Sequence, residues 1–251
     1  MRARKPLRRG ARGDDRGERR PAVRALQRDR RDGHRTRAGA ARVLSLERAL
    51  GKPHPRVVGV DDGAFDRRDR YAPIAAVVVT LPDRLEAVRV GRVRVDGQDA
   101  TARVARLIAQ LPGRDGVRAV LLDGAVVGGF NVVDLDAVAR AAGVPVVAVT
   151  RRPPDFARIR AALRRWFPRT AARRWAVLRR HRLVRVPTGG VPLWAAAAGC
   201  PTRDAIRLVR RCAVRGYWPE PLRLAHLVAS AGAPERSLKP RSRRGSTGPV
   251  A

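Results

Sequence analysis

Three short apolar segments of the chain end in aspartate followed by glycine: RVVGVDDG (residues 56–63), RVRVDG (92–97) and RAVLLDG (118–124). Runs of β-branched and aliphatic residues of this length are typical of strands, and Asp-Gly is typical of the turn that follows a strand. In a sheet covered by helices, strands read as nearly continuous apolar runs, and their ends open onto the crevice where ligands bind. The three segments therefore predict an α/β fold with carboxylates gathered at an edge of its sheet.

Acidic residues are concentrated around these segments. Residues 53–150 hold 12 of the chain's 22 Asp and Glu, although the chain carries 55 Lys and Arg. Carboxylates within a few ångströms of one another repel unless a cation neutralises them, so the cluster predicts either a Mg²⁺ or Mn²⁺ site or raised pKa values. One Asp-Gly pair alone is better explained as a turn. Three pairs in this order favour the metal site.

The formal charge of +33 and the pI near 12 indicate a polyanionic partner, DNA in the first place and RNA in the second. Arg outnumbers Lys by 52 to 3, so a coding bias explains part of this charge equally well. The two cysteines, Cys200 and Cys212, fit a reducing, cytoplasmic setting. No apolar run approaches the ~20 residues that span a bilayer, so we expect no membrane segment.

The pattern of a folded domain begins at about residue 53. We interpret residues 1–52 as a basic, disordered extension, or as a stretch that precedes the true start, and residues 233–251 as a disordered basic tail. Between them the periodicity predicts an antiparallel meander, a helix capped by Asp99, and a parallel strand–helix–strand unit. The expected ranges are strands at 57–61, 74–80 and 87–95, a helix at 100–111, then a strand at 119–123, a helix at 133–142 and a strand at 144–150.

The following segment is rich in arginine. Residues 151–185 contain 13 Arg and one acidic residue, with Trp166, Phe167 and Trp175 between them, and two helices fit this stretch best. Such helices can follow a nucleic-acid backbone while a tryptophan stacks on a base, or the tryptophans can anchor the helices in the core. A short strand at 183–186, an apolar run at 191–198 and helices from Thr202 and Pro219 complete the expected order.

Six motifs together resemble the archaeal family called domain of unknown function 99, or endonuclease dU. They are GVDDGAF (59–65), RVDGQDAT (94–101), LLDG (121–124), GFNVVD (129–134), GVPVVAVTRRP (143–153) and GYWPEPLRLAHLVAS (216–230). That family is similar to endonuclease V of the ribonuclease H-like superfamily. The resemblance implies a mixed five-stranded sheet with helices on both faces and carboxylates at its centre.

The same resemblance implies roles for individual residues. Asp61 and Asp123 match the carboxylates that hold a divalent cation in endonuclease V, and Asp96 matches a third one. Two residues depart from the pattern, because Arg151 stands where endonuclease V has lysine and His226 where it has an acidic residue. A histidine can still ligate Mn²⁺ or act as a general acid. No aromatic loop matches in residues 88–93, so the way a base would be exposed stays open.

These observations predict a Mg²⁺- or Mn²⁺-dependent DNA endonuclease, and the resemblance alone implies that it acts at deaminated bases, with deoxyuridine ahead of deoxyinosine. The main alternative is a non-catalytic nucleic-acid-binding protein on the same fold, and a third is a nucleotide-binding ATPase, which would need a second, similar half. Asp134 is interpreted as a helix cap, and His54 and His181 receive no catalytic role. The candidate catalytic residues are Asp61, Asp96, Asp123, Arg151 and His226, the first three also as metal ligands; the candidate nucleic-acid contacts are Arg151, Arg152, Tyr217 and Trp218.

Overall fold

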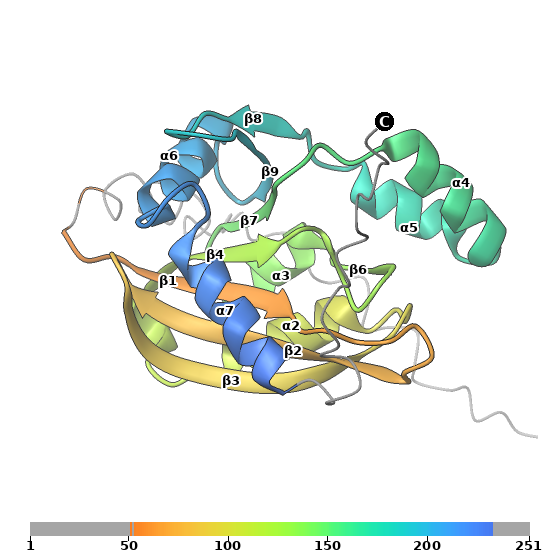
Figure 1. Cartoon of the computed structure of the whole chain (residues 1–251), viewed down its shortest axis with the longest axis horizontal. Helices are drawn as coiled ribbons and strands as arrows, with labels where there is room; N and C mark the ends of the chain where they lie inside the picture. Colours follow the sequence, from red (N-terminus) through yellow and green to blue (C-terminus); the bar gives the residue numbers. More distant parts are fainter. Residues whose placement is uncertain (1–50, 52, 233–251) are drawn as a thin grey trace, which may run out of the picture. The chain divides into compact units, whose positions relative to one another are not determined.

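One seven-stranded mixed sheet forms the centre of the protein. The computed structural model describes Gly51 and residues 53–232, so the predicted disorder of 1–52 and 233–251 concerns residues outside the described part. The strands lie in the order β3-β2-β1-β4-β7-β9-β8 (Figure 1). Their bounds are β1 Arg56–Asp62, β2 Tyr71–Thr80, β3 Arg84–Arg94, β4 Val117–Asp123, β7 Val146–Thr150, β8 Val184–Val186 and β9 Leu193–Ala198.

The pairing of the strands follows the predicted order. Strands β1, β2 and β3 form the antiparallel meander, and β1, β4 and β7 are parallel neighbours. These five strands make up the mixed sheet that the resemblance implies. Strands β9 and β8 then extend the sheet with antiparallel pairing beyond β7. A separate two-stranded ribbon, β5 (Val126–Val127) and β6 (Asn131–Val132), follows β4.

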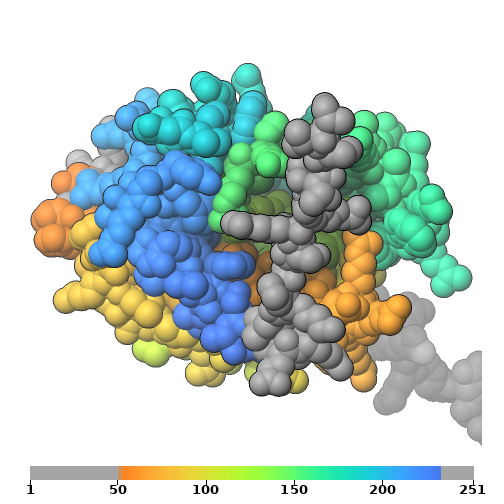
Figure 2. Space-filling model, viewed as in Figure 1, coloured from red at the N-terminus to blue at the C-terminus, as the bar shows by residue number. Residues whose placement is uncertain are grey.

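Helices cover both faces of the sheet. Helices α2 (Ala100–Ala109) and α3 (Leu135–Ala142) pack on one face, and α6 (Thr202–Cys212) and α7 (Glu220–Ala231) on the other, where the space-filling view shows them side by side (Figure 2). Helices α4 (Phe156–Trp166) and α5 (Ala171–Leu178) follow β7 as a hairpin, and a 3-10 turn (Arg114–Gly116) precedes β4. None of the described helices is long and apolar enough to cross a membrane.

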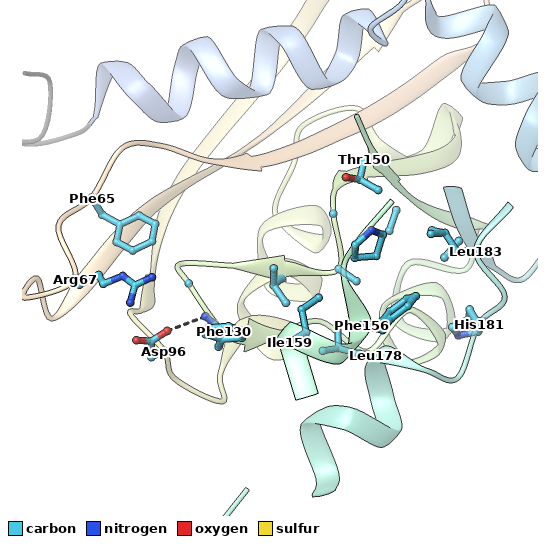
Figure 3. A pocket seen from close by; sticks show the side chains of 17 residues that line it. Phe65, Arg67, Asp96, Phe130, Thr150, Phe156, Ile159, Leu178, His181 and Leu183 are labelled. Carbon is cyan, nitrogen blue, oxygen red and sulfur yellow. Dashed lines mark hydrogen bonds between the residues drawn. The ribbon is translucent and has the colours of Figure 1, made fainter. Parts of the chain in front are cut away.

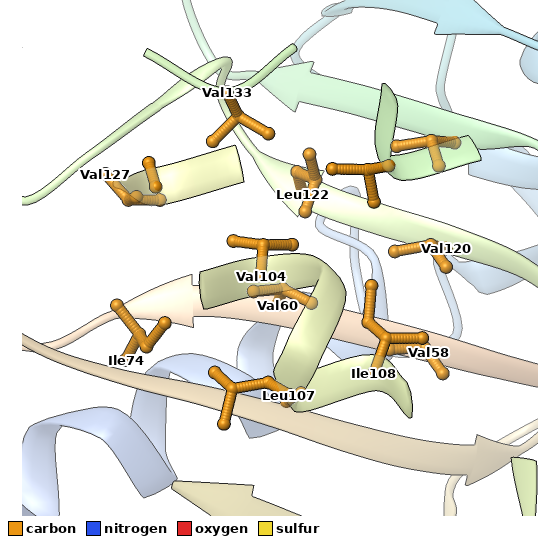
Figure 4. Close-up of a cluster of buried hydrophobic side chains, with 14 of the residues drawn as sticks. Val58, Val60, Ile74, Val104, Leu107, Ile108, Val120, Leu122, Val127 and Val133 are labelled. Atoms are coloured by element: carbon orange, nitrogen blue, oxygen red, sulfur yellow. The ribbon is translucent and has the colours of Figure 1, made fainter. Parts of the chain in front are cut away.

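Alternation along the strands produces two hydrophobic cores. Val58 and Val60 of β1 face the core under α2 and α3 (Figure 4), whereas Val57 faces the core under α6 and α7. In β4, Leu122 belongs to the first core and Leu121 to the second. Each fully buried side chain of this size stabilises the fold by about 1.5–3 kcal/mol. Burial on both faces explains why these strands read as continuous apolar runs.

Helix α7 lies directly against the backbone of β1. A Cβ atom added at Gly59 would stand 2.0 Å from the carbonyl oxygen of Pro221, and one at Gly63 would stand 2.3 Å from that of Ala229. Only glycine permits such an approach at these two positions. Because the two contacts are four residues apart on the strand and eight apart on the helix, α7 runs along β1 and holds its middle residues over Asp61.

The start of α2 differs from the prediction. Asp99 occupies the capping position, but its side chain makes no capping hydrogen bond, and the amide of Ala100 donates instead to Oδ1 of the buried Asn131, 2.9 Å away. The side-chain amide of Asn131 in turn donates to Asp99 Oδ1 at 2.7 Å. The cap therefore comes from a residue on β6, which sequence spacing does not indicate. The capping of α3 by Asp134, which accepts from the amide of Ala137, is as predicted.

Candidate active site

Asp61 and Asp123 are neighbours at the carboxyl ends of adjacent parallel strands. Val60 pairs with Leu122, so the two aspartates follow at the same level of β1 and β4. Adjacent strands are ~4.8 Å apart. Leu121 belongs to the core under α7, and alternation places Asp123 on that same face, where Asp61 also meets α7. The structure thus brings the two predicted carboxylates together on one side of the sheet.

Helix α7 supplies the predicted histidine to this pair. Nδ1 of His226 lies 2.9 Å from Oδ2 of Asp61, although 165 residues separate them. The Asp61 side chain is 4% exposed and that of His226 is 57% exposed. The contact therefore joins a buried carboxylate to a ring that reaches solvent.

A third aspartate, Asp62, supports the site from the other side. Its backbone amide donates to Oδ1 of Asp61 at 2.8 Å, and its own Oδ2 accepts from the amide of Gly128 at 2.6 Å. Gly128 lies in the turn between β5 and β6, where its φ of 56° is in the left-handed region. Asp62 thus fixes the end of β1 to the β5–β6 turn.

Burial and mutual repulsion control the charge of these carboxylates. Burial, followed by the charges of Asp123 and Asp62, raises the pKa of Asp61 to about 9. Burial also raises the pKa of Asp62, against the hydrogen bond from Gly128, and the pKa of Asp123, against the nearby charge of Arg151. Clustered carboxylates with raised pKa values are typical of functional sites.

Arg151 completes this side of the site from the end of β7. Its Nη1 lies 3.5 Å from Oδ2 of Asp123, and its guanidinium carbon lies 3.7 Å from the centre of the Trp218 ring. Trp218 Nε1 is buried, and no partner for it is present among the described residues. Arg152 and Tyr217, the other predicted nucleic-acid contacts, are exposed beside these two residues in the chain.

Asp96 makes its hydrogen bonds with the β5–β6 turn and with α5. Its Oδ1 accepts from the amide of Phe130 at 2.7 Å, its amide donates to the carbonyl of Gly128 at 2.8 Å, and its carbonyl accepts from Arg174 at 2.8 Å. With a φ of 56°, Asp96 forms a left-handed turn after β3. Its carboxylate thereby holds the β5–β6 turn, to which Asp62 also bonds through the amide of Gly128, and the role of Asp96 as a metal ligand stays a prediction.

An apolar cavity of about 490 Å³ lies on the face of the sheet opposite to Asp61 and Asp123, and no pattern in the sequence indicates it (Figure 3). Gly124, next to Asp123, and Thr150, next to Arg151, line one part of it. Arg67 and His181 are among its polar lining residues, and Nε2 of His181 lies 3.1 Å from Oδ2 of Asp136. Most of the wall is aromatic and aliphatic, and includes Phe65, Phe130, Phe156, Ile159, Leu178 and Leu183.

Comparison with known proteins places this chain in a family. A family model described as endonuclease dU matches residues 53–232. The chain belongs to the endonuclease dU family. A UPF0215 protein of Methanosarcina barkeri is 35% identical over 71% of this chain and 91% of the relative, and one of Methanothermobacter thermautotrophicus is 37% identical over 71% and 88%. The resemblance seen in the sequence is thereby confirmed.

Solved structures give the fold of this endonuclease dU family member. A protein of unknown function from Archaeoglobus fulgidus is 32% identical, with a TM-score of 0.63, over 70% of this chain and 97% of the other. Human ENDOV is 17% identical, with a TM-score of 0.50, over 77% and 95%. At that identity the likeness concerns the fold alone, and it confirms the predicted ribonuclease H-like architecture.

The donors of this endonuclease dU site fit a hard divalent cation. In the described part of the chain, no three acidic, histidine or cysteine side chains already converge into a closed metal cage. Mg²⁺ does not require one, because it binds through one or two carboxylates and keeps its waters and substrate phosphates as further ligands. Asp61 and Asp123 supply two carboxylates, and a cation between them would offset the repulsion that, after burial, raises the pKa of Asp61.

Proposed function

We propose that this protein is a Mg²⁺- or Mn²⁺-dependent endonuclease that hydrolyses a phosphodiester at or near deaminated bases in DNA, deoxyuridine ahead of deoxyinosine. The observation that carries the proposal is the placement of Asp61 and Asp123 at the same level of two parallel strands, on one face of the sheet. Membership of the endonuclease dU family supports phosphodiester hydrolysis. The base preference comes from that family and not from the geometry.

In this proposal Asp61 and Asp123 hold the cation, and Asp62 orients Asp61 through its backbone amide. When bound, the cation supplies positive charge at the attacking and leaving oxygens of an in-line displacement. Arg151 binds a non-bridging oxygen of the phosphate, and its stacking on Trp218 limits its motion. His226 uses Nδ1 toward Asp61, so Nε2 is left to donate a proton to the leaving oxygen.

The apolar cavity is where we place the base next to the cleaved phosphodiester. A base turned out of its stack needs a pocket with aromatic walls and a few polar groups. Phe65, Phe130 and Phe156 are suitable walls, and Arg67 and His181 are suitable partners for the edge of the base. The cavity reaches the carboxyl ends of β4 and β7 at Gly124 and Thr150, so the phosphate next to a base bound there would lie at the edge of the sheet where Asp61 and Asp123 also lie.

Cleavage assays test the proposal. Purified protein is incubated with labelled duplexes that carry uracil, hypoxanthine or no modification, with Mg²⁺, with Mn²⁺ or with EDTA. We expect cleavage of the uracil duplex with either metal and none in EDTA. Asp123→Asn, which keeps the shape of the side chain but removes its charge, should lose at least ~100-fold in rate. Intact duplex under every condition, with binding unchanged by Asp123→Asn, would instead support a non-catalytic nucleic-acid-binding protein.

The non-catalytic alternative has one specific observation in its favour. His226 and Arg151 each contact one of the two aspartates, so protein groups already offset part of the negative charge that a cation would neutralise. Thermal unfolding separates the two functions without any substrate. An endonuclease site should unfold at a higher temperature in Mg²⁺ than in EDTA, and Asp61→Asn should remove that difference.

A further inference from the structure

The hairpin of α4 and α5 carries many positive charges and has a single acidic residue next to it in the chain. Between Arg151 and Arg203 the chain contains one acidic residue, Asp155, which caps α4 by accepting from the amide of Arg158 at 3.0 Å. The preceding hundred residues, by contrast, hold most of the acidic side chains of the domain. A coding bias toward arginine adds cations everywhere, but it does not remove acids from one hairpin. The hairpin therefore has the charge of a surface that meets a polyanion.

Four exposed arginines gather where the two helices join. We call Arg164, Arg165, Arg169 and Arg173 the arginine tip. Arg164 and Arg165 lie in the last turn of α4, where a cation complements the helix dipole. Arg173 lies in the first turn of α5, where the dipole opposes a cation, and Arg169 lies in the connection. Stabilisation of the helices therefore explains the positions of Arg164 and Arg165 but not those of Arg169 and Arg173.

Trp166 stands in the middle of the arginine tip and is 63% exposed. The guanidinium of Arg165 lies 4.9 Å from the centre of its ring. The other aromatic residues of the hairpin pack inward: Trp175 contacts Phe156, with ring centres 6.1 Å apart, and Phe167 contacts Phe130 at 5.6 Å. Trp166 is thus not a core anchor. An exposed indole among arginines is the usual platform on which an unpaired base stacks.

A buried arginine fixes the hairpin to the candidate site. Arg174 of α5 is 6% exposed, and its guanidinium donates to the carbonyl of Asp96 at 2.8 Å and to the carbonyl of Phe130. Phe130 lines the apolar cavity, and Asp96 holds the turn next to it. The arginine tip is thereby held at a constant distance from the cavity, on the side of the domain where Figure 1 shows α4 and α5.

We propose that the arginine tip and Trp166 bind single-stranded nucleic acid, with phosphates on the arginines and one base stacked on Trp166. The proposal rests on the proposed function in one respect, because it assigns this strand to the stretch that flanks the cleaved phosphodiester. Its binding chemistry needs neither the cation nor cleavage. The two proposals can therefore fail separately.

The first test compares two triple variants that remove the same charge. In the tip variant, Gln replaces Arg164, Arg165 and Arg169. In the control variant, Gln replaces Arg114, Arg118 and Arg140, which lie together where β4 begins and α3 ends. Binding of a labelled oligothymidylate is measured by fluorescence anisotropy in EDTA across a salt series. Each lost phosphate contact should lower the slope of log K against log salt by ~0.7, so we expect a decrease of about 2 for the tip variant.

The second test concerns the stacked base. Trp166→Ala should weaken binding to the single strand by about tenfold or more, and Trp166→Phe should retain most of the affinity, because any aromatic face can stack. Fully paired duplex, whose bases are already stacked, should lose much less with Trp166→Ala. Unfolding temperatures close to that of wild type establish that the variants are folded.

Two results would overturn the proposal. Equal losses in the tip variant and in its charge-matched control would show that net charge alone attracts the strand. Equal losses on single strand and duplex with Trp166→Ala would remove the stacking step. If no cleavage is found under any condition but these binding differences remain, the proposed function fails and this inference stands.

Discussion

Helix α7 lies so close to β1 that the methyl group added by Gly59→Ala tests whether this contact positions His226. In Gly59→Ala, the new Cβ would stand 2.0 Å from the carbonyl oxygen of Pro221. Real Cβ atoms keep at least 3.0 Å from such an atom, so the gap must widen by 3.0 − 2.0 = 1.0 Å or more. The obstacle is backbone, which cannot swing aside as a side chain can. The start of α7 must therefore move away from the strand.

This movement has two consequences of calculable size. Overpacking at a tight contact costs about 1–3 kcal/mol, which lowers the unfolding temperature by several degrees in a domain of this size. A shift of about 1 Å also stretches the 2.9 Å contact between His226 and Asp61 beyond hydrogen-bond range. Misplacement of a catalytic group by that distance costs up to ~100-fold in rate. We expect at least a tenfold loss of cleavage from a substitution that touches no reacting group.

Gly189→Ala is the matched control, because nothing lies within 4 Å of the Cβ that it adds. Both variants are measured for cleavage of a uracil-containing duplex and for thermal unfolding with and without Mg²⁺. The control should behave as wild type in each assay. A Gly59→Ala protein that unfolds at the wild-type temperature and cuts at the wild-type rate would refute the view that α7 positions His226 through its contact with β1.

Contacts in and around the site predict three more outcomes. Because the pKa of Asp61 in the folded protein is raised to about 9, the folded protein in EDTA loses stability as pH rises from ~4 to ~9, by about 1.4 kcal/mol for each pH unit between the unfolded and folded pKa values. Asp61→Asn should therefore raise the unfolding temperature more at pH 8 than at pH 5. An equal effect at both pH values would contradict this. The pKa of buried Glu220 is lowered, first by hydrogen bonds from Arg223, so this pair stabilises the folded protein above the unfolded pKa, and its stabilisation is lost as pH falls through the folded pKa. In urea unfolding, Glu220→Gln should lower the free energy of unfolding by about 1 kcal/mol at pH 7 and by much less at pH 3. Ile159→Trp should fill the apolar cavity and raise KM for a uracil duplex while the Mg²⁺-dependent rise in unfolding temperature is unchanged; an unaltered KM would remove the base from the cavity.

The parts of the site that the sequence predicted are those that local patterns control. Strand length and alternation follow from the apolar runs, and parallel neighbours end at the same edge of a sheet, so Asp61 and Asp123 could be placed together without coordinates. The two arginine-rich helices and the βαβ unit followed from periodicity in the same way. His226 could not be placed by any local rule. The resemblance indicated its helix, and the close approach at Gly59 and Gly63 explains how it reaches Asp61.

Prediction from the sequence failed where contacts between distant segments decide the outcome. Asp96 and Asp123 look alike as strand-end aspartates followed by glycine, but Asp96 adopts a left-handed turn and its carboxylate accepts a hydrogen bond from the amide of Phe130. Asp99 is a good helix cap by type, yet Asn131 makes the capping bond. The walls of the cavity come from loops, from the strands β5, β7 and β9 and from the helices α4 and α5, at positions without a common period. Asp99 thus lost its expected role to a partner that lies 32 residues away in the chain.

The division of charge along the chain has a physical reason under the proposed function. Carboxylates that hold a cation must be buried and rigid, and here they lie at the ends of two central strands. Cations that hold a flexible polyanion work best exposed, and they lie on helices outside the sheet. Arg151 stands at the junction, because β7 ends beside Asp123 and the arginine-rich hairpin begins a few residues later. A phosphate bound by Arg151 would thus lie next to the carboxylates, at one end of a row of phosphates that continues along the hairpin. Cleavage of a bound strand requires this arrangement, because the hairpin holds the strand while the carboxylates act at its end.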